Sequence, residues 1–198
     1  MLDTIAENQP DRRPAILVCV YESADPLWTA IDEEAASWTP PGTRLRPVGP
    51  GDPAALAALI TGQLEDADCR AVLLVGRTRK SNGFRVQLRA ENRALDGGKK
   101  ISQTGPALAR ATAPAAEMVR ALIDAGLVAD ASSDSEEDTG SYLLYRVLAA
   151  LPDNADAPSV GLLRVPASLN VDQLRLGVQT AAAAMARHLS PLPRARLN

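Results

Sequence analysis

Four segments of this chain have the hydrophobic pattern of strands. Ala15–Val20 and Ala71–Gly76 are continuous aliphatic runs, which are typical of strands that a parallel sheet buries on both faces. Thr43–Val48 lies between two turns rich in Pro and Gly, and Ser159–Val165 is closed by Pro166. The pattern therefore predicts a sheet built around these four strands.

A fifth strand is indicated by strict alternation rather than by a continuous run. Phe84, Val86 and Leu88 alternate with polar residues, which is the period of a half-exposed strand. Because Arg85, Arg89 and Arg93 follow on the polar side, we expect this face to be wet and the strand to lie at a sheet edge.

Apolar residues at helical spacing predict helices between the strands. Asp25-Pro26 and Asp52-Pro53 each offer an N-cap followed by a proline in the first turn. Asn170 is in the N-cap position of the closing helix, with Gln173 placed for a capping box. Two further helices are expected, one carrying Ala115, Met118, Leu122 and Ile123 on its buried side and ending at Gly126, the other carrying Tyr142, Leu143, Val147 and Leu151.

Strands that alternate with helices predict a three-layer α/β/α fold with a mostly parallel central sheet. A length of 198 residues fits one domain, so we expect residues 1–198 to form a single α/β domain with flexible tails at 1–13 and 190–198. The acidic segment Asp130–Asp138 has no apolar period, and an exposed loop is expected there.

The amino-acid composition and net charge exclude several classes of function. A net charge of −3 gives no electrostatic case for nucleic acid or an anionic membrane, and no apolar run is long enough to span a bilayer. Two cysteines and one histidine exclude a disulfide scaffold and a cysteine-based zinc site, and no phosphate- or dinucleotide-binding motif is present. We therefore expect a cytoplasmic protein without a metal or another cofactor.

Five segments, in order along the chain, resemble one enzyme family. They are Ile16–Glu22, Val72–Arg77, Glu91–Asp96, Gly161–Pro166 and the closing helix Val171–Leu189. Their order and spacing look like pyroglutamyl peptidase I, or pyrrolidone-carboxylate peptidase, a cytoplasmic cysteine peptidase that removes an N-terminal pyroglutamyl residue. The resemblance implies the hydrolase-like α/β/α fold of that family and a homo-oligomer, a dimer or a tetramer.

The same resemblance implies a cysteine nucleophile, a histidine base and an acidic partner, and this chain departs at all three positions. Two registers are open for the nucleophile: one places Gly140 at the cysteine position, and the other places Leu144 there. The histidine position holds Arg164, which stays protonated and cannot act as a base. The acid position falls at Gly83 or Phe84.

Other reactive side chains are weak candidates to replace the missing catalytic groups. Cys19 and Cys69 lie in or beside predicted strands, so we expect buried, inert thiols. His188 is expected in the last turn of the closing helix, where the helix dipole favours a cation. Ser141, with Thr139 nearby, is a weak candidate nucleophile at a helix start, against the simpler interpretation of a helix-capping hydroxyl.

Arg164 has two interpretations. With Arg77, Arg79 and Lys80 it would form a cationic pocket for a carboxylate or phosphate at the ends of central strands. Alternatively, it forms an ion pair with the acidic segment 130–138, which we favour. The candidate ligand-binding residues are Arg77, Arg79, Arg164 and Tyr21.

The first hypothesis for function is a relative of pyroglutamyl peptidase that has lost its catalytic groups and has a binding or scaffolding role. A second is a hydrolase with relocated catalytic groups near Thr139 and Ser141, and a third is a small-anion sensor that uses Arg164. The ligand expected for a binding role is a small carboxylate or a peptide N-terminus.

Overall fold

The computed structural model describes residues 13–22, 38–78, 80–154 and 156–189 of the chain. Its elements are β1 (Ala15–Val20), β2 (Arg44–Val48), α2 (Pro53–Gln63), β3 (Cys69–Thr78), β4 (Phe84–Gln87), β5 (Arg89–Glu91), β6 (Leu108–Arg110), α3 (Ala115–Asp124), β7 (Ala129–Ser132), α4 (Thr139–Ala149), β8 (Ser159–Pro166) and α5 (Val171–Ala186). The helix expected after Asp25-Pro26, Arg79 and the two tails apart from Arg13 lie outside the described residues.

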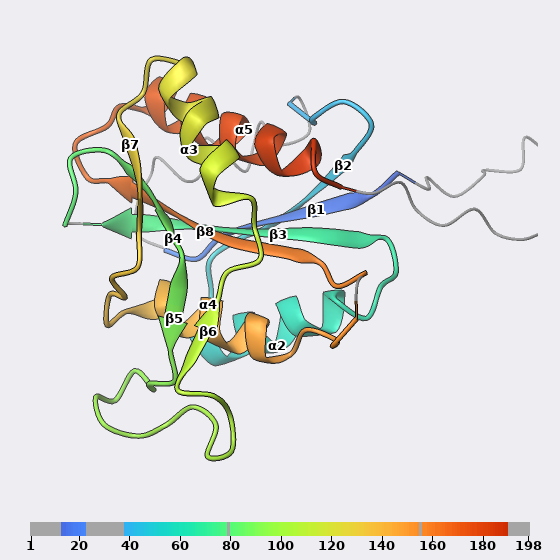
Figure 1. The fold of residues 1–198 in the computed structure, drawn as a ribbon, viewed down its shortest axis with the longest axis vertical. Coiled ribbons are helices and arrows are strands. Elements are labelled where there is room, and N and C mark those ends of the chain that lie inside the picture. Colours follow the sequence, from blue (N-terminus) through green and yellow to red (C-terminus); the bar gives the residue numbers. More distant parts are fainter. Residues whose placement is uncertain (1–12, 23–37, 79, 155, 190–198) are drawn as a thin grey trace, which may run out of the picture.

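A six-stranded sheet in the order β2-β1-β3-β8-β4-β7 forms the middle layer. Helices α3 and α5 cover one face of this sheet, and α2 and α4 cover the other (Figure 1). The pairings are parallel except that of β4 with β8, which is antiparallel. This is the mostly parallel three-layer α/β/α architecture that the sequence predicts.

The reversed direction of β4 has a simple cause. The chain between Thr78 and Phe84 is far too short for a crossover helix, so the strand that follows β3 returns antiparallel beside β8. The chain then reaches β7 through α3 and restores parallel pairing.

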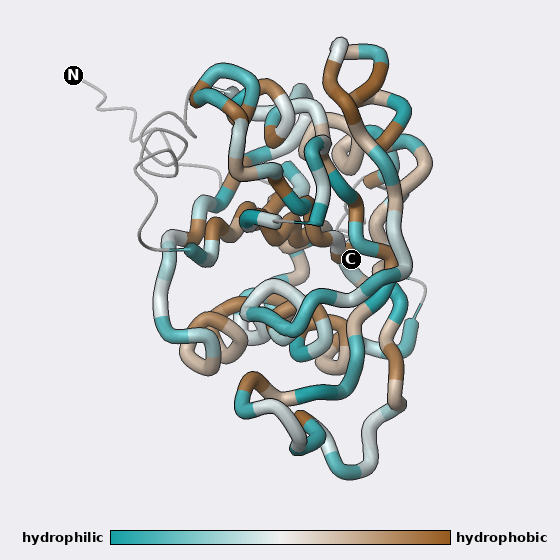
Figure 2. The backbone as a smooth tube through the Cα atoms, turned by 90° about the vertical axis from the view of Figure 1, so that its left-hand side faces the viewer, coloured by the Kyte–Doolittle hydropathy of each residue, from teal (hydrophilic) through white to brown (hydrophobic). Residues whose placement is uncertain are grey.

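Alternation along the central strands divides the core into two halves. Ile16, Val18 and Val20 of β1 pack with α3 and α5, whereas Leu17 and Cys19 pack with α2 and α4. The same alternation runs through β3 and β8, and Figure 2 shows these central strands as the most hydrophobic part of the backbone. Burial on both faces explains why these strands are continuous apolar runs.

The predicted helix caps are present. The carboxylate of Asp52 accepts hydrogen bonds from the backbone N–H groups of Ala54 and Ala55 at the start of α2. Asn170 and Gln173 form the capping box of α5. Local sequence therefore decides where these two helices begin.

Four predictions about individual elements are wrong. The strand β4 lies between β8 and β7 rather than at a sheet edge, and Gln87 on its polar side is buried. Ile123 is 54% exposed, although Met118 and Leu122 of the same helix are fully buried. The acidic segment is not wholly a loop, because residues 130–132 belong to β7.

A small hairpin that the sequence pattern did not predict stands beside α4. Its strands β5 and β6 pair antiparallel, and the loop between them is fastened by Asn92. The Asn92 amide donates to the Ser102 carbonyl at 2.7 Å and accepts from the Ser102 N–H at 2.9 Å. Tyr145 of α4 donates from its hydroxyl to the Pro106 carbonyl, which ties the hairpin to the main layer.

Candidate functional site

Arg164 is the centre of a polar cluster at the carboxyl ends of the central strands, the edge at which open α/β sheets bind ligands. Its neighbours Leu163 and Val165 pack against the α3 and α5 layer, so Arg164 points to the side of α4. The side chain is 0% exposed. A guanidinium in such a place is stable only when its N–H donors are hydrogen bonded and its charge is paired.

The acidic partner of Arg164 is Asp138, the residue before α4. Nη1 and Nη2 of Arg164 donate to the two carboxylate oxygens of Asp138 at 2.5 and 2.8 Å. Asp138 also accepts the Ser141 N–H at 3.0 Å and so caps α4. The ion pair with the acidic segment, the favoured interpretation of Arg164, is therefore present.

Gln87 is the second partner and the residue that sequence reasoning missed. Its amide oxygen accepts from Nε and Nη2 of Arg164 at 3.0 and 2.9 Å, and its amide nitrogen donates to the Arg89 carbonyl and to Ser141 Oγ. Gln87 is placed on the α4 side of the sheet because it lies one position from Val86, which faces the opposite layer. The sequence alone gives no signal for this contact, because the need for a neutral acceptor follows from the burial of Arg164, which only the structure shows.

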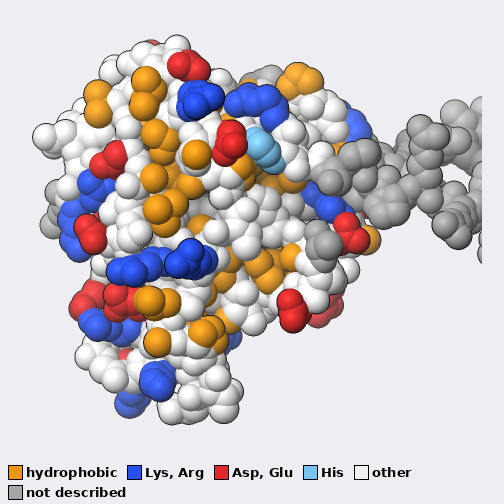
Figure 3. All heavy atoms as spheres, in the orientation of Figure 1, with side chains coloured by type: hydrophobic (Ala, Val, Ile, Leu, Met, Phe, Trp, Pro, Cys, Tyr) orange, Lys and Arg blue, Asp and Glu red, His pale blue; other side chains and the backbone are white. Residues whose placement is uncertain are grey.

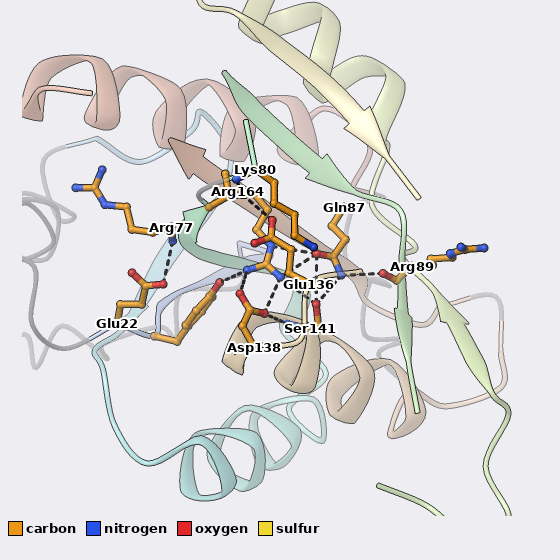
Figure 4. A network of polar contacts seen from close by, with 11 residues as sticks. Glu22, Arg77, Lys80, Gln87, Arg89, Glu136, Asp138, Ser141 and Arg164 are labelled. Carbon is orange, nitrogen blue, oxygen red and sulfur yellow. Dashed lines mark hydrogen bonds and ion pairs between the residues drawn. The ribbon is translucent and has the colours of Figure 1, made fainter. Parts of the chain in front are cut away.

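Ser141, which is labelled in Figure 4, and Tyr21 complete the cluster. Ser141 Oγ accepts from Arg164 Nη2 and from the Gln87 amide, both at 3.0 Å. The Tyr21 hydroxyl accepts from Arg164 Nη1 at 3.0 Å, and burial raises the pKa of this phenol far above its ordinary value. The cap of α4 is Asp138, so the interpretation of Ser141 as a capping hydroxyl is wrong.

A groove of about 570 Å³ runs past this cluster on the solvent side. Its lining residues are Glu22, Arg77, Thr78, Lys80, Glu136, Asp138 and Ala167. The Glu22 carboxylate accepts the Arg77 N–H at 3.1 Å, and burial raises the pKa of that carboxyl. The Thr78 hydroxyl donates to Glu136 at 2.6 Å, so the groove has both signs of charge rather than a purely cationic lining.

Comparison with solved structures matches this architecture to one group of enzymes. Pyroglutamyl peptidase I from Bacillus amyloliquefaciens superposes with a TM-score of 0.76 at 17% identity, over 89% of this chain and 96% of that chain. Pyrrolidone carboxyl peptidase from Thermus thermophilus superposes with a TM-score of 0.71 at 21% identity, over 85% and 99%. The chain has the pyroglutamyl peptidase fold. A mutant pyrrolidone carboxyl peptidase from Pyrococcus furiosus agrees, with a TM-score of 0.77 at 15% identity over 89% and 100%.

Sequence comparisons alone do not reach this result. No protein-family model matches the chain, and no curated protein matches it by sequence. The likeness to pyroglutamyl peptidases is thus a likeness of fold, and the chemistry depends on the residues of this chain.

On the pyroglutamyl peptidase fold, two of the three positions expected to be catalytic meet. A Cβ built on Gly140 would lie 2.7 Å from Arg164 Nη1 and 2.2 Å from the Tyr21 hydroxyl oxygen. Gly140 is therefore in contact with Arg164, whereas Leu144 is buried one turn further along α4.

The third position is not brought to the cluster. Phe84 packs on the α3 and α5 side of the sheet, where its ring would lie 2.1 Å from a Cβ on Gly177. Gly83 lies against Val128, next to β7. A side chain that points in the same direction as that of Phe84 lies on the opposite face of the sheet from Arg164. Gln87 makes the contact with Arg164 instead.

The remaining candidates lie away from the groove. Cys19 and Cys69 are free and buried, and burial raises the pKa of the Cys69 thiol to about 11, which disfavours a thiolate. His188 is exposed and lies just beyond the end of α5, not in its last turn as expected, because the helix ends at Ala186. Among the described residues there is no His, Cys, Asp or Glu group suited to a metal ion, and no described helix is long and apolar enough to span a bilayer.

Proposed function

We propose that this protein has the pyroglutamyl peptidase fold without the peptidase reaction, and that it has a binding or scaffolding role. The observation that carries the proposal is the ion pair of the buried Arg164 with Asp138. The Tyr21 hydroxyl bonds to the same guanidinium and lies against Gly140. Arg164, which stands where a histidine base is expected, is here neutralised by Asp138.

The chemistry of a cysteine peptidase needs a thiolate and a base that accepts and returns a proton. Neither Gly140 nor Leu144 has a thiol, and the guanidinium of Arg164 does not release a proton at physiological pH. Space also argues against a nucleophile at Gly140, because Tyr21 and Arg164 already occupy the volume that its side chain would need.

A hydrolase that uses Ser141, with Thr139 beside it, is the alternative from the enzyme class. Ser141 Oγ is the acceptor in two hydrogen bonds of 3.0 Å, whose donors are Arg164 and Gln87. Within the described part of the chain, the Ser141 hydroxyl donates to the Gln87 amide oxygen at 3.5 Å, and an amide oxygen is not a base. This environment supports a structural serine.

Turnover of a pyroglutamyl chromogenic substrate tests the proposal. We expect no release of the chromophore above the uncatalysed rate, with a pyroglutamyl peptidase assayed in parallel as the positive control. We also expect no stoichiometric labelling by iodoacetamide or a fluorophosphonate. Turnover that disappears in Ser141→Ala or Cys19→Ser would contradict the proposal.

The groove is the place where we propose that a ligand binds. Arg77 and Lys80 offer positive charge for a small carboxylate, and Glu22 and Glu136 offer negative charge for a peptide N-terminus. A thermal-shift screen of carboxylates and short peptides tests this, because a ligand that binds only the folded state raises the melting temperature. An Arg164→Ala variant that keeps the full shift would exclude a direct role for Arg164.

Three further properties are proposed on the family resemblance and on composition. They are a single domain over residues 1–198, a homo-oligomer and a cytoplasmic location. The free, buried thiols of Cys19 and Cys69 agree with a reducing compartment.

A further inference from the structure

The groove beside the Arg164 cluster lies where the strand order of the sheet reverses. From β1 the chain crosses to β2 on one side, and it then returns to β3 on the other side of β1. The carboxyl ends of β1 and β3 therefore border the crevice in which open α/β sheets bind their ligands, and Glu22 follows β1 while Arg77 and Thr78 end β3. The volume of about 570 Å³ lies within the range of ~300–1,000 Å³ that is usual for small-molecule sites. A small molecule is therefore the expected occupant.

The two arginines nearest to the groove are already engaged within the chain. Nε of Arg164 donates one hydrogen bond, Nη1 two and Nη2 three to the polar cluster, which engages all five N–H groups of a guanidinium. The Arg77 guanidinium donates from Nη1 to the Pro166 carbonyl at 2.8 Å, and Figure 4 shows it directed away from Arg164. Lys80 is therefore the positive group of the lining that is best placed for a ligand.

Lys80 and Glu22 line the groove without an ion-pair partner among the residues that the structure describes. Lys80 is exposed, and its backbone N–H bonds to the Thr78 hydroxyl at 3.1 Å. Glu22 accepts the Arg77 N–H, and because burial raises the pKa of its carboxyl, a cation that reached it would stabilise the ionised form. Figure 4 shows the side chains of Glu22 and Lys80 well apart, so one ligand can bring an opposite charge to each.

The mixture of charges in the groove disfavours a ligand that has only one charge. A carboxylate without an amine is attracted by Lys80 but repelled by Glu22 and Glu136, and an amine without a carboxylate meets the reverse. Figure 3 shows basic and acidic side chains side by side along the margin of the molecule where the arrows of β3 and β8 end. A molecule with both charges finds a favourable partner at each end.

We propose that the groove binds a small zwitterion, an amino acid or a short unblocked peptide, with Glu22 receiving its ammonium group and Lys80 its carboxylate. The inference rests on the binding role proposed above, which a carboxylate or an amine alone would also satisfy. It places both charges on one molecule and gives Arg164 no direct contact with it. A pyroglutamyl group has a lactam in place of the free amino group, so Glu22 selects against it.

Thermal melts of the full chain test the charges of the ligand. The common L-amino acids and alanyl-alanine are each added at about 10 mM, and the one with the largest effect is then compared with its N-acetyl and amide derivatives. At about ten times its dissociation constant, the zwitterion should raise the Tm by about 3–6 °C. The derivatives, which have one charge each, should bind at least about tenfold more weakly.

Two variants test which residue binds which end of the ligand. Glu22→Gln should lower the affinity for the zwitterion at least about tenfold but hardly change that for its N-acetyl derivative, which has no ammonium group. Lys80→Met should show the same relation between the zwitterion and its amide derivative, which has no carboxylate. Glu65→Gln and Lys100→Met, at exposed positions outside the groove, are the matched controls and should bind as the wild type does. Because each variant is compared between two ligands, a change in its own stability does not produce this pattern.

The outcomes separate this inference from the binding role on which it rests. Equal Tm shifts from the zwitterion and its blocked derivatives, or an unchanged affinity in either groove variant, would overturn the inference and leave the binding role in place. The absence of a shift with every amino acid and with alanyl-alanine would overturn it as well. Turnover of a pyroglutamyl substrate would instead contradict the proposed function itself.

Discussion

The replacement of Asp138 by Asn tests the central claim that Arg164 is held by a buried charge pair. Asp138 accepts from both terminal nitrogens of Arg164 and from the Ser141 N–H. Asn has nearly the same shape and is also a good N-cap residue, so the cap of α4 is kept. The variant therefore removes a negative charge and little else.

The expected cost follows from burial. Removing one partner of a buried ion pair costs about 3–5 kcal/mol, because the other charge stays buried without compensation. Arg164 is fully buried, but the Asp138 side chain is 32% exposed, which places the loss at the lower end of that range. We expect about 3 kcal/mol, or a fall of roughly 6–12 °C in Tm for a chain of this size.

Asp130→Asn is the matched control. Asp130 also forms a two-bond pair with an arginine, but the side chains of Arg85 and Asp130 are 19% and 51% exposed, so the loss should be below about 1 kcal/mol. Urea unfolding followed by circular dichroism at neutral pH measures both variants. Equal losses of unfolding free energy in the two variants would refute the reasoning that the burial of Arg164 makes its ion pair the more costly one to break.

Two further predictions concern the same site. Gly140→Ala should destabilise the fold by about 1–3 kcal/mol, because the new Cβ would lie 2.2 Å from the Tyr21 hydroxyl oxygen. The control is Gly62→Ala, because nothing lies within 4 Å of a Cβ at that position, and it should stabilise α2 by up to about 1 kcal/mol. Urea unfolding measures both variants, and a similar gain in stability for the two would exclude close packing at Gly140. Glu22→Gln should raise stability at neutral pH, since burial raises the pKa of Glu22 above its ordinary value of 4.5 and the ionised carboxylate therefore opposes folding. The folded carboxyl binds its proton more tightly than the unfolded one, so the gain should vanish as the pH falls below 4.5; thermal melts across this range that show a constant gain would contradict the assignment.

Only part of the candidate site could be predicted from the sequence. Arg164 stands out in the sequence because it takes the place of an expected histidine, and a partner in the acidic segment could be expected from charge alone. Gln87 could not be recognised, because an alternating strand looks half-exposed whether its polar side meets water or a buried arginine. The choice between these depends on which helix covers that face, and here it is α4.

The role of Tyr21 is a second feature that local pattern does not contain. Its side chain lies against Gly76 of β3 as well as Gly140 of α4, two positions that are distant from each other in the chain. Each glycine by itself is unremarkable in sequence. Together they make room for one aromatic ring, and only the packing of β1, β3 and α4 brings them to it.

By itself the sequence determined the features that depend on near neighbours: the buried strand Ala15–Val20, the Asp52 cap and the capping box at Asn170. Each rests on interactions within a few residues, so local composition was sufficient. The tertiary structure alone decided the place of β4 inside the sheet, the place of β7 at the end of the strand order and the partners that Arg164 meets. These depend on contacts between segments far apart in the chain, where the competing arrangements have the same local pattern and differ in what each face finally packs against.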